Sequence, residues 1–386
     1  MHMDPVMPQA VGAILSILVT GFILRLLRQP HVVAYLLAGV VIGPWGLSLV
    51  SDSALIGRLG ALGVVLLLFF VGMETDPRKL IAHWKTSIFG TLLQILLSIA
   101  AVWLVGYFYG WTTVRILLFG FVISLSSTAI VIKLLQEKGL LNSRIGQSVL
   151  GITLAQDLAV IPMLVILGML GSDELDTAHL AKQAVGTIAA GLLFVLIFKR
   201  DKIVLPLSKI IKEDKELQLF AALTICFGLA FMSAWFDLST ALGAFIAGML
   251  VGSAKETEWV HQTLDSFKVL FVAVFFVSVG MLLDVDFLIK HWVLAGMLLL
   301  AVLITNTFVN ALVLRMASYK WKESIFAGLL LSQIGEFSFV LTAVGYQSSI
   351  INNFGYQLSL CVISLSLLVS PLWINAGEKL LNIRKS

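Results

Sequence analysis

The stretch GITLAQDLAVIPMLVIL, residues 151 to 167, carries one carboxylate, Asp157, near the middle of an apolar run from Ile145 to Leu170. A charge at the centre of a bilayer costs about 2.5 to 3.5 kcal/mol even on the gentler insertion scales, so an aspartate at that depth is by default a functional residue. The alternative for Asp157 is an acid kept protonated and hydrogen-bonded between helices. The composition of the chain decides whether lipid surrounds this run.

The whole chain has the composition of a membrane protein. Of its 386 residues 59% are hydrophobic and only 12% are charged, against about 25% charged in soluble domains, and the mean hydropathy is +1.01. A helix that crosses the hydrocarbon core needs about 20 mostly apolar residues, and about thirteen segments meet this requirement. They are expected at 10–27, 31–50, 57–73, 86–109, 113–136, 144–170, 183–199, 216–235, 238–253, 263–283, 287–315, 323–346 and 354–378. We therefore expect an all-α integral membrane protein.

The basic residues predict the orientation of these segments, because Lys and Arg gather in short cytoplasmic loops. Of the 26 Lys and Arg residues, 22 follow odd-numbered segments. The other four are Arg58, Arg115, Lys182 and Lys290. The N-terminus is therefore expected outside and the C-terminus in the cytoplasm, with the chain in the inner (plasma) membrane. The opening MHMDPVMPQA lacks the basic start of a signal peptide, so the first segment is expected to be a retained helix.

Three pairs of short sequences recur in the same order, about 206 to 209 residues apart. LLAGVVIG (36–43) matches FIAGMLVG (245–252), LFFVGM (68–73) resembles VFFVSVGM (274–281), and SLSST (124–128) corresponds to LSQIGEF (331–337). Each pair is seven segments apart, so the two copies cross the membrane in opposite directions. Three ordered matches favour an inverted repeat over chance. The copies are expected at about 31–170 and 238–378, linked by the seventh segment and the basic stretch 199–216.

Polar residues interrupt equivalent segments of the two copies. Such interruptions are typical of secondary transporters, in which broken helices turn backbone dipoles and freed carbonyls toward an ion near the midplane. Ser and Thr can instead bond to their own helix without breaking it. The matching positions favour a functional role. The first interruption contains Ser124, Ser126, Ser127 and Thr128, and the second contains Ser332, Gln333, Gly335 and Glu336.

The neighbours of Asp157 in its own segment are also polar. Gln156 can supply a carbonyl ligand or a hydrogen-bond donor, and Thr153 lies one turn away on the Asp157 face. The repeat offset pairs Asp157 with Ile363. The repeat therefore predicts a scaffold in which one copy alone carries the acid.

Seven motifs together carry a family resemblance that covers nearly the whole chain. PHVVAYLLAGVVIGPWGL, LLFFVGMETDPRKL, SLSSTAIVIKLLQEKGL, LAQDLAVIP, ALGAFIAGMLVGS, FFVSVGMLLD and LSQIGEFSFVL resemble the membrane domain of the Kef-type (glutathione-gated) potassium efflux systems, within the cation:proton antiporter superfamily. The pair Gln156-Asp157 is the most telling, since sodium-proton relatives more often carry Asp-Asp or Asn-Asp there. The resemblance implies a sodium-proton antiporter-like fold of thirteen helices with two crossing broken helices. It also implies a homodimer with a panel-like dimerisation domain and a mobile core that moves the ion like an elevator.

The resemblance also implies which residues bind the ion. They are Asp157, Gln156, Ser126 and Thr128, with potassium (or sodium) at Asp157, and the supporting residues are Ser127, Ser332, Gln333, Glu336, Asn306 and Asn310. Electrogenic sodium-proton relatives place a lysine in the segment of Asn306 and Asn310, where this chain has no charge between Lys290 and Arg315. We expect no charged partner from that segment. The two asparagines either orient Asp157 or pair between helices.

Kef systems continue into a cytoplasmic nucleotide-binding domain, whereas this chain stops at Ser386 and contains no G-x-G-x-x-G loop that opens a helix. We therefore expect residues 1–386 to form a single transmembrane antiporter domain, whose regulatory domain was removed or is lacking in this member. A cytoplasmic regulatory domain or subunit is an expected partner. The stretch HQTLDSFK, 261–268, resembles a shortened form of the loop that meets the regulatory domain, or is a solvated loop.

The function expected from these features is exchange of a monovalent cation, potassium by the resemblance, for protons. A single carboxylate that holds either ion predicts electroneutral exchange. The expected partners are membrane lipid and a second copy of the chain, with no nucleic acid and no cofactor beyond the transported ions. A sodium/proton antiporter, a cation channel and a sodium-coupled organic-anion symporter are the alternatives. An enzyme is not expected, because neither two opposed intramembrane aspartates nor an H-E-x-x-H cluster is present.

Overall fold

The computed structural model describes residues 31–50, 52–74, 85–170, 177–199, 214–236, 238–253 and 258–380, together with Leu15, Val19, Thr20 and Phe22. The predicted first segment, 10–27, lies almost entirely outside the described residues. So do residues 75–84, 171–176, 200–213 and 381–386. The predictions made for all residues outside the described ranges, including those that rest on 11 of the 26 Lys and Arg residues used for orientation, stay predictions.

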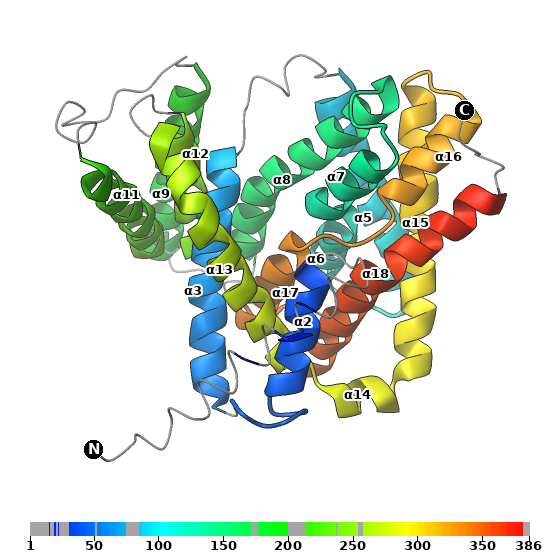
Figure 1. Cartoon of the computed structure of the whole chain (residues 1–386), viewed down its shortest axis with the longest axis horizontal. Coiled ribbons are helices and arrows are strands. Elements are labelled where there is room, and N and C mark those ends of the chain that lie inside the picture. Colours follow the sequence, from blue (N-terminus) through cyan, green and yellow to red (C-terminus); the bar gives the residue numbers. More distant parts are fainter. Residues whose placement is uncertain are drawn as a thin grey trace. The chain divides into compact units, whose positions relative to one another are not determined.

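Every regular element in the described ranges is a helix (Figure 1). Helices satisfy their own backbone hydrogen bonds, as the interior of a bilayer requires. From residue 31 onward each predicted segment overlaps a helix or a helix interrupted once, but the segment 31–50 is helical only as far as Ile42. The elements are α2 (His31–Ile42), α3 (Ser53–Glu74), η1 (Lys85–Phe89), α5 (Gly90–Phe108), α6 (Thr113–Ser124), α7 (Thr128–Glu137), α8 (Arg144–Leu170), α9 (Thr177–Lys199), α11 (Lys215–Trp235), α12 (Thr240–Gly252), α13 (Glu258–Leu282), α14 (Val285–Lys290), α15 (Trp292–Met316), α16 (Trp321–Leu330), α17 (Phe337–Gln347) and α18 (Asn353–Leu380).

The helices have the length and the surface that lipid requires. Within the described ranges, six helices are long and apolar enough to cross a membrane by length and composition, and several shorter apolar helices accompany them. Large apolar side chains are exposed on their outer faces, among them Phe108 on α5, Phe231 on α11 and Leu372 on α18. Such faces would be costly in water, but in a bilayer the hydrocarbon tails cover them. The chain is a multi-pass membrane protein.

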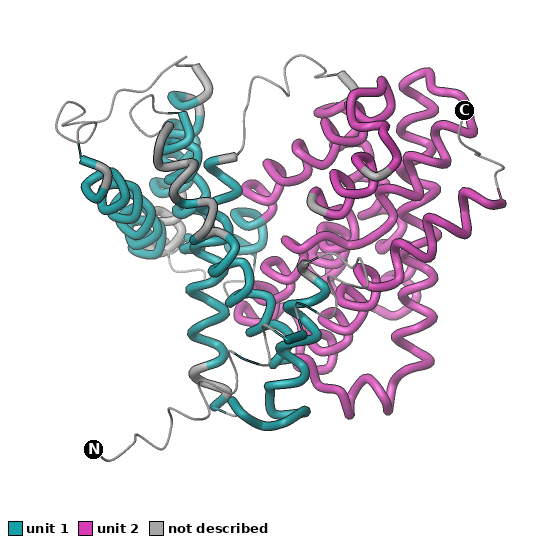
Figure 2. Tube along the Cα trace, in the orientation of Figure 1, with its two compact units in different colours: residues 1–77, 164–282 teal, residues 78–163, 283–386 magenta. Residues whose placement is uncertain are grey.

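The chain divides into two compact units, coloured separately in Figure 2. The first unit consists of residues 1–77 and 164–282, and the second of residues 78–163 and 283–386. Each unit therefore consists of two stretches that are separated in the sequence. Helices from both predicted copies of the repeat occur in each unit.

Glycines bring α2 and α13 of the first unit into backbone contact. A Cβ atom on Gly39 would collide with the carbonyl oxygen of Val277, and one on Gly280 would collide with that of Leu36. The two helices can approach this closely only because both positions lack a side chain. The motif LLAGVVIG is thus an interface for a second helix.

The helices α3 and α12 of the first unit pack in the same way. A Cβ atom on Gly248 would collide with the carbonyl oxygen of Phe69, and one on Gly72 would collide with that of Phe245. These α12 and α3 positions are related to the α2 and α13 positions by the offset of about 208 residues seen between the sequence motifs. The glycine contacts between helices therefore recur at the same offset as the sequence motifs.

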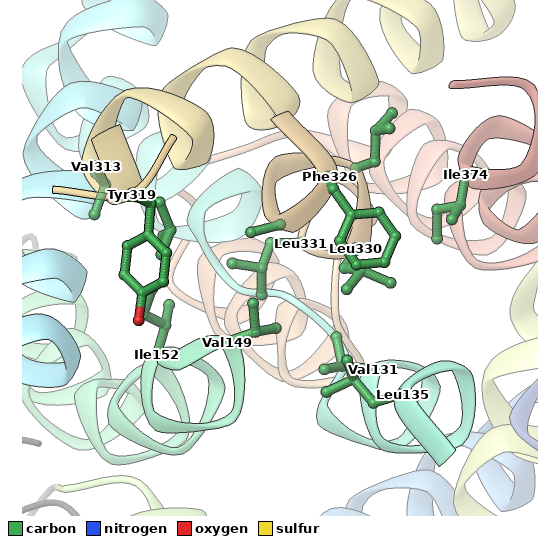
Figure 3. Close-up of a cluster of buried hydrophobic side chains, with 13 residues drawn as sticks. Val131, Leu135, Val149, Ile152, Val313, Tyr319, Phe326, Leu330, Leu331 and Ile374 are labelled. Carbon is green, nitrogen blue, oxygen red and sulfur yellow. The ribbon is translucent and has the colours of Figure 1, made fainter. Parts of the chain in front are cut away.

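The core of the second unit joins helices that are far apart in the sequence. Figure 3 shows a cluster of buried apolar side chains from the helices α7, α8, α15, α16 and α18. At the edge of the unit Lys138, which ends α7, forms an ion pair with Glu378 on α18. This core fixes α7 and α16 against α8. Each of α7 and α16 is one half of an interrupted helix, whose other half is α6 or α17 respectively. The labelled members are Val131, Leu135, Val149, Ile152, Val313, Tyr319, Phe326, Leu330, Leu331 and Ile374.

The glycine contacts predict a large effect of one methyl group. Gly248→Ala should destabilise the protein by about 1 to 3 kcal/mol, because overpacking at a backbone contact forces α3 and α12 apart. Gly228→Ala on α11 is the matched control, since its Cβ atom would meet nothing within 4 Å and alanine favours the helix. Thermal melting of the detergent-solubilised variants measures the difference. Equal melting temperatures for the two variants would contradict the tight contact.

Candidate functional site

The two helix interruptions lie where the polar stretches of the sequence predicted them, and both are in the second unit. In the first copy α6 ends at Ser124 and α7 begins at Thr128, and in the second α16 ends at Leu330 and α17 begins at Phe337. The chain between α6 and α7 is extended at Leu125 and Ser127. Ser127 then caps α7, because its hydroxyl accepts a hydrogen bond from the N–H of Ile130 (3.4 Å). The predicted breaks are confirmed.

The two interruptions cross each other in direct backbone contact. The N–H of Gly335 donates to the carbonyl oxygen of Leu125 at 2.7 Å. A Cβ atom on Gly335 would stand 2.7 Å from the carbonyl carbon of Ser126, so only glycine fits at the crossing. One turn later the hydroxyl of Ser338 donates to the carbonyl oxygen of Val122 (2.7 Å). The break in each helix is thus held by the other helix.

Amide side chains satisfy the carbonyl groups that the interruptions leave without a helical partner. The Nε2 atom of Gln94 on α5 donates to the oxygen of Ser124 (2.7 Å). The Nδ2 atom of Asn306 on α15 donates to the oxygen of Ile123 (2.8 Å) and to that of Ser332 (3.1 Å). These oxygens lie at the C-terminal, partly negative ends of the half-helices α6 and α16. One neutral amide therefore serves both broken helices.

The second asparagine of α15 supports the first. The Nδ2 atom of Asn310 donates to the backbone oxygen of Asn306 (2.9 Å) and lies 3.5 Å from that of Leu331. The oxygen of Leu331 also accepts the hydroxyl of Ser126 (2.8 Å). Of the two roles left open by the sequence, these contacts show the asparagines pairing with the broken helices.

Asp157 lies on α8 with 6% of its surface exposed. The hydroxyl of Thr128 donates to its Oδ2 atom at 2.8 Å. Because Thr128 is the first residue of α7, the carboxylate stands at the N-terminus of a half-helix, where the aligned N–H groups favour a negative charge. A buried acid, a hydroxyl and a helix N-terminus thus meet beside the crossing.

Gln156 is completely buried next to the first interruption. Its Oε1 atom accepts the N–H of Ser126 (3.0 Å), and its Nε2 atom donates to Oε1 of Gln94 (3.0 Å). The structure therefore brings Gln156 together with Ser126, Thr128 and Asp157. Its carbonyl oxygen, predicted as an ion ligand, is directed at a backbone N–H group.

The remaining predicted residues lie around the crossing with different partners. The hydroxyl of Ser332 bonds to its own helix at the oxygen of Leu329 (2.8 Å). Gln333 donates from Nε2 to the oxygen of Ser127 (3.5 Å). Glu336 directly precedes α17. Thr153, which shares the Asp157 face in the sequence pattern, donates to the oxygen of Leu150 (3.0 Å) in its own helix.

The sequence analysis missed two residues of this network, Gln94 and Ser366. The hydroxyl of Ser366 on α18 accepts the N–H of Ile334 (3.1 Å) in the second interruption. Gln94 had a signal that could have revealed it, because it is the single amide in the apolar sequence of α5. Ser366 had none, since serines are common in membrane helices.

The groups around Asp157 suit some ions better than others. Hydroxyl, carboxylate and carbonyl oxygens are hard ligands, which suit K⁺, Na⁺ and protons rather than soft metals. Among the residues that the structure describes, no three His, Cys, Asp or Glu side chains lie together in a way that could hold a metal ion. Oxygen ligands of this kind can hold a small cation or a proton.

Known proteins resemble this chain over most of its length. The model of the family "sodium/hydrogen exchanger, transmembrane" matches residues 13–376. The chain is 37% identical over 365 residues to the iron transporter MagA of Paramagnetospirillum magneticum, covering 95% of this chain and 84% of that protein. It is 31% identical over 371 residues to K(+) efflux antiporter 5 of Arabidopsis thaliana, covering 94% of this chain and 65% of that protein.

Solved structures share the fold at low sequence identity. The sodium proton antiporter MjNhaP1 of Methanocaldococcus jannaschii at pH 8 matches with a TM-score of 0.71 and 18% identity, covering 98% of both chains. A second structure of MjNhaP1, determined by electron microscopy, matches with a TM-score of 0.63 and 17% identity over the full length of both. By its sequence and its fold, the chain belongs to the transmembrane sodium/hydrogen exchanger family of cation:proton antiporters.

Proposed function

We propose that this chain exchanges potassium for protons across the membrane and that Asp157 carries both ions in turn. The observation that supports this most is the hydrogen bond of 2.8 Å from Thr128 to a buried Asp157 beside two crossing helix breaks. Potassium is favoured over sodium by the Gln156-Asp157 pair of the Kef-type resemblance and by the relative named K(+) efflux antiporter 5. This is the activity of a transporter and not of an enzyme.

The exchange follows from competition for one negative charge. With a cation bound, the cation neutralises the carboxylate of Asp157, with the hydroxyl oxygen of Thr128 within reach as a further oxygen ligand. In the return state a proton neutralises the same carboxylate. The site then carries no net charge in either moving state, which avoids exposing a bare charge to lipid. One cation exchanges for one proton, and the exchange is electroneutral.

The second unit is the moving part in this proposal. It holds Asp157, both interruptions and the amides that fix them, all within residues 78–163 and 283–386. A rigid body of this kind can carry the ion by an elevator movement against the first unit, whose glycine contacts α2–α13 and α3–α12 tie backbones together. The first unit is then the stationary scaffold and the surface for a homodimer.

The inverted repeat is part of the same proposal. The oxygens of Ser124 and Ser332, about 208 residues apart, each accept an amide from a neighbouring long helix. The glycine contacts of the first unit recur at the same offset. The distribution of Lys and Arg supports an N-terminus outside and a cytoplasmic C-terminus in the plasma membrane.

Transport of different cations tests the proposed substrate. Proteoliposomes with a trapped pH dye should respond to K⁺ and Rb⁺ more strongly than to Na⁺ and Li⁺. A response to Na⁺ alone makes the protein a sodium/proton antiporter. Because one relative is named an iron transporter, Fe²⁺ under reducing conditions belongs in the series, and a response to Fe²⁺ alone rejects the monovalent cation. Currents of K⁺ without proton movement would indicate a channel.

Asp157→Asn should abolish exchange, because the amide can hold neither the proton nor the cation charge. The rate should fall to that of empty liposomes, while Asp286→Asn on α14 retains wild-type exchange. In the wild type the apparent cation affinity should weaken as the pH falls, since protons compete for the carboxylate. Exchange that persists in Asp157→Asn, or transport driven by a membrane potential alone, contradicts the one-for-one scheme.

Thr128→Val should raise the apparent KM for the cation by about ten- to hundredfold. A hydrogen bond to a charged group contributes about 1.5 to 3 kcal/mol, and 1.4 kcal/mol corresponds to a factor of ten. Thr153→Val is the matched control, because its hydroxyl bonds within its own helix. Initial rates at a series of cation concentrations measure both variants. If the KM of Thr128→Val equals that of Thr153→Val, the hydroxyl of Thr128 takes no part in binding.

A further inference from the structure

Gln94 is buried in α5, with none of its surface exposed, and it contacts two residues of the site. Its Nε2 atom donates to the oxygen of Ser124 (2.7 Å), and its Oε1 atom accepts from Nε2 of Gln156 (3.0 Å). The Oε1 atom of Gln156 in turn accepts the N–H of Ser126 (3.0 Å). Two amides therefore connect the carbonyl before the interruption with the N–H group inside it.

The backbone dictates the orientation of both amides. The oxygen of Ser124 can only accept, so the nitrogen of Gln94 must face it, and the N–H of Ser126 can only donate, so the oxygen of Gln156 must face that group. The atoms left over, Oε1 of Gln94 and Nε2 of Gln156, then meet as acceptor and donor. Neither amide can be turned round without losing two hydrogen bonds. Gln94 thus fixes the direction of Gln156.

The direction of Gln156 matters because of its neighbour. Gln156 and Asp157 are consecutive on α8, and Ser126 and Thr128 are two residues apart in the interruption. The bonds from Gln156 to Ser126 and from Asp157 to Thr128 are therefore successive links between the same two segments. A shift of the first link moves the hydroxyl of Thr128 relative to the carboxylate.

At the second interruption a serine, and not a glutamine, holds the corresponding backbone N–H group. There the N–H of Ile334, about 208 residues after Ser126, donates to Ser366, whose hydroxyl also bonds to the oxygen of Ile363 in its own helix (2.8 Å). A serine thus caps this break. The pair of buried amides occurs at the interruption that faces Asp157.

We propose that Gln94 is a positioning residue for ion exchange: through Gln156 it holds the interruption in the place where Thr128 meets Asp157. This inference rests on the proposed antiport function and adds a residue to its site. Gln94 contacts neither the ion nor Asp157 in this role. Its loss should therefore weaken cation binding more than it slows the turnover of loaded protein.

The first experiment measures the interruption directly. Gln94→Met keeps the length of the side chain and removes both hydrogen-bonding atoms. Hydrogen–deuterium exchange of peptides that cover residues 124–131 should become at least tenfold faster in this variant. Ser98→Ala, one turn further along α5, is the matched control, because the buried hydroxyl of Ser98 has no hydrogen-bond partner. Unchanged protection in Gln94→Met overturns the inference, whatever the protein transports.

The second experiment measures exchange in proteoliposomes. In Gln94→Met the apparent KM for K⁺ should rise about tenfold with the maximal rate within about twofold, and Ser98→Ala should resemble the wild type. The double variant Gln94→Met/Gln156→Met should be no worse than Gln156→Met alone, because the two amides act as one unit. Additive effects, or an unchanged KM, overturn the inference while leaving antiport intact.

Two further outcomes are decisive. If Gln94→Met does not fold, Gln94→Asn retains the amide on a shorter side chain, and it should show the same rise in KM and the same faster hydrogen exchange. Wild-type behaviour of Gln94→Asn in both measurements overturns the inference. If wild-type protein exchanges none of the cations for protons, the antiport proposal fails, and the positioning role of Gln94 fails with it.

Discussion

The constraint on which the rest of this structure depends is the hydrogen bonding of the backbone where two membrane helices are interrupted. In a bilayer no water is available for freed N–H and C=O groups, and each group left unsatisfied costs several kcal/mol. The interruptions at 124–128 and 331–337 are tolerated because they cross and share hydrogen bonds, as between Gly335 and Leu125. Side chains of α5, α8, α15 and α18 form further hydrogen bonds with the freed backbone groups.

The side chains that form these hydrogen bonds with the interruptions are neutral. The partly negative ends of α6 and α16 receive hydrogen bonds from the amides of Gln94 and Asn306 rather than from a lysine of the kind that electrogenic relatives place on the equivalent of α15. An amide stabilises a freed carbonyl without adding a charge to the unit. In the proposed electroneutral exchange, the carboxylate of Asp157 then binds the cation and the proton in turn.

Different kinds of contact stabilise the interior of each unit. In the first unit glycines allow backbones to touch, at Gly39 and Gly280 and again at Gly72 and Gly248. In the second unit a polar network surrounds the crossing, and an apolar cluster locks the half-helices α7 and α16 against α8. In the proposed mechanism, the glycine-packed unit is the scaffold and the unit with the polar network is the part that moves.

The sequence by itself determined the class of the protein, the positions of most helices from residue 31 onward, both interruptions and the buried acid, because these depend on local composition and on residues close in the chain. Only the tertiary structure decided which groups satisfy the interruptions. The bond from Ser126 to Leu331 spans 205 residues, and that from Asn306 to Ile123 spans 183. Sequence patterns could not show that Gln156 faces a backbone N–H group, that Thr153 bonds to its own helix or that Gln94 joins the site. These choices depend on which helices lie side by side, and that is settled by packing of the whole fold.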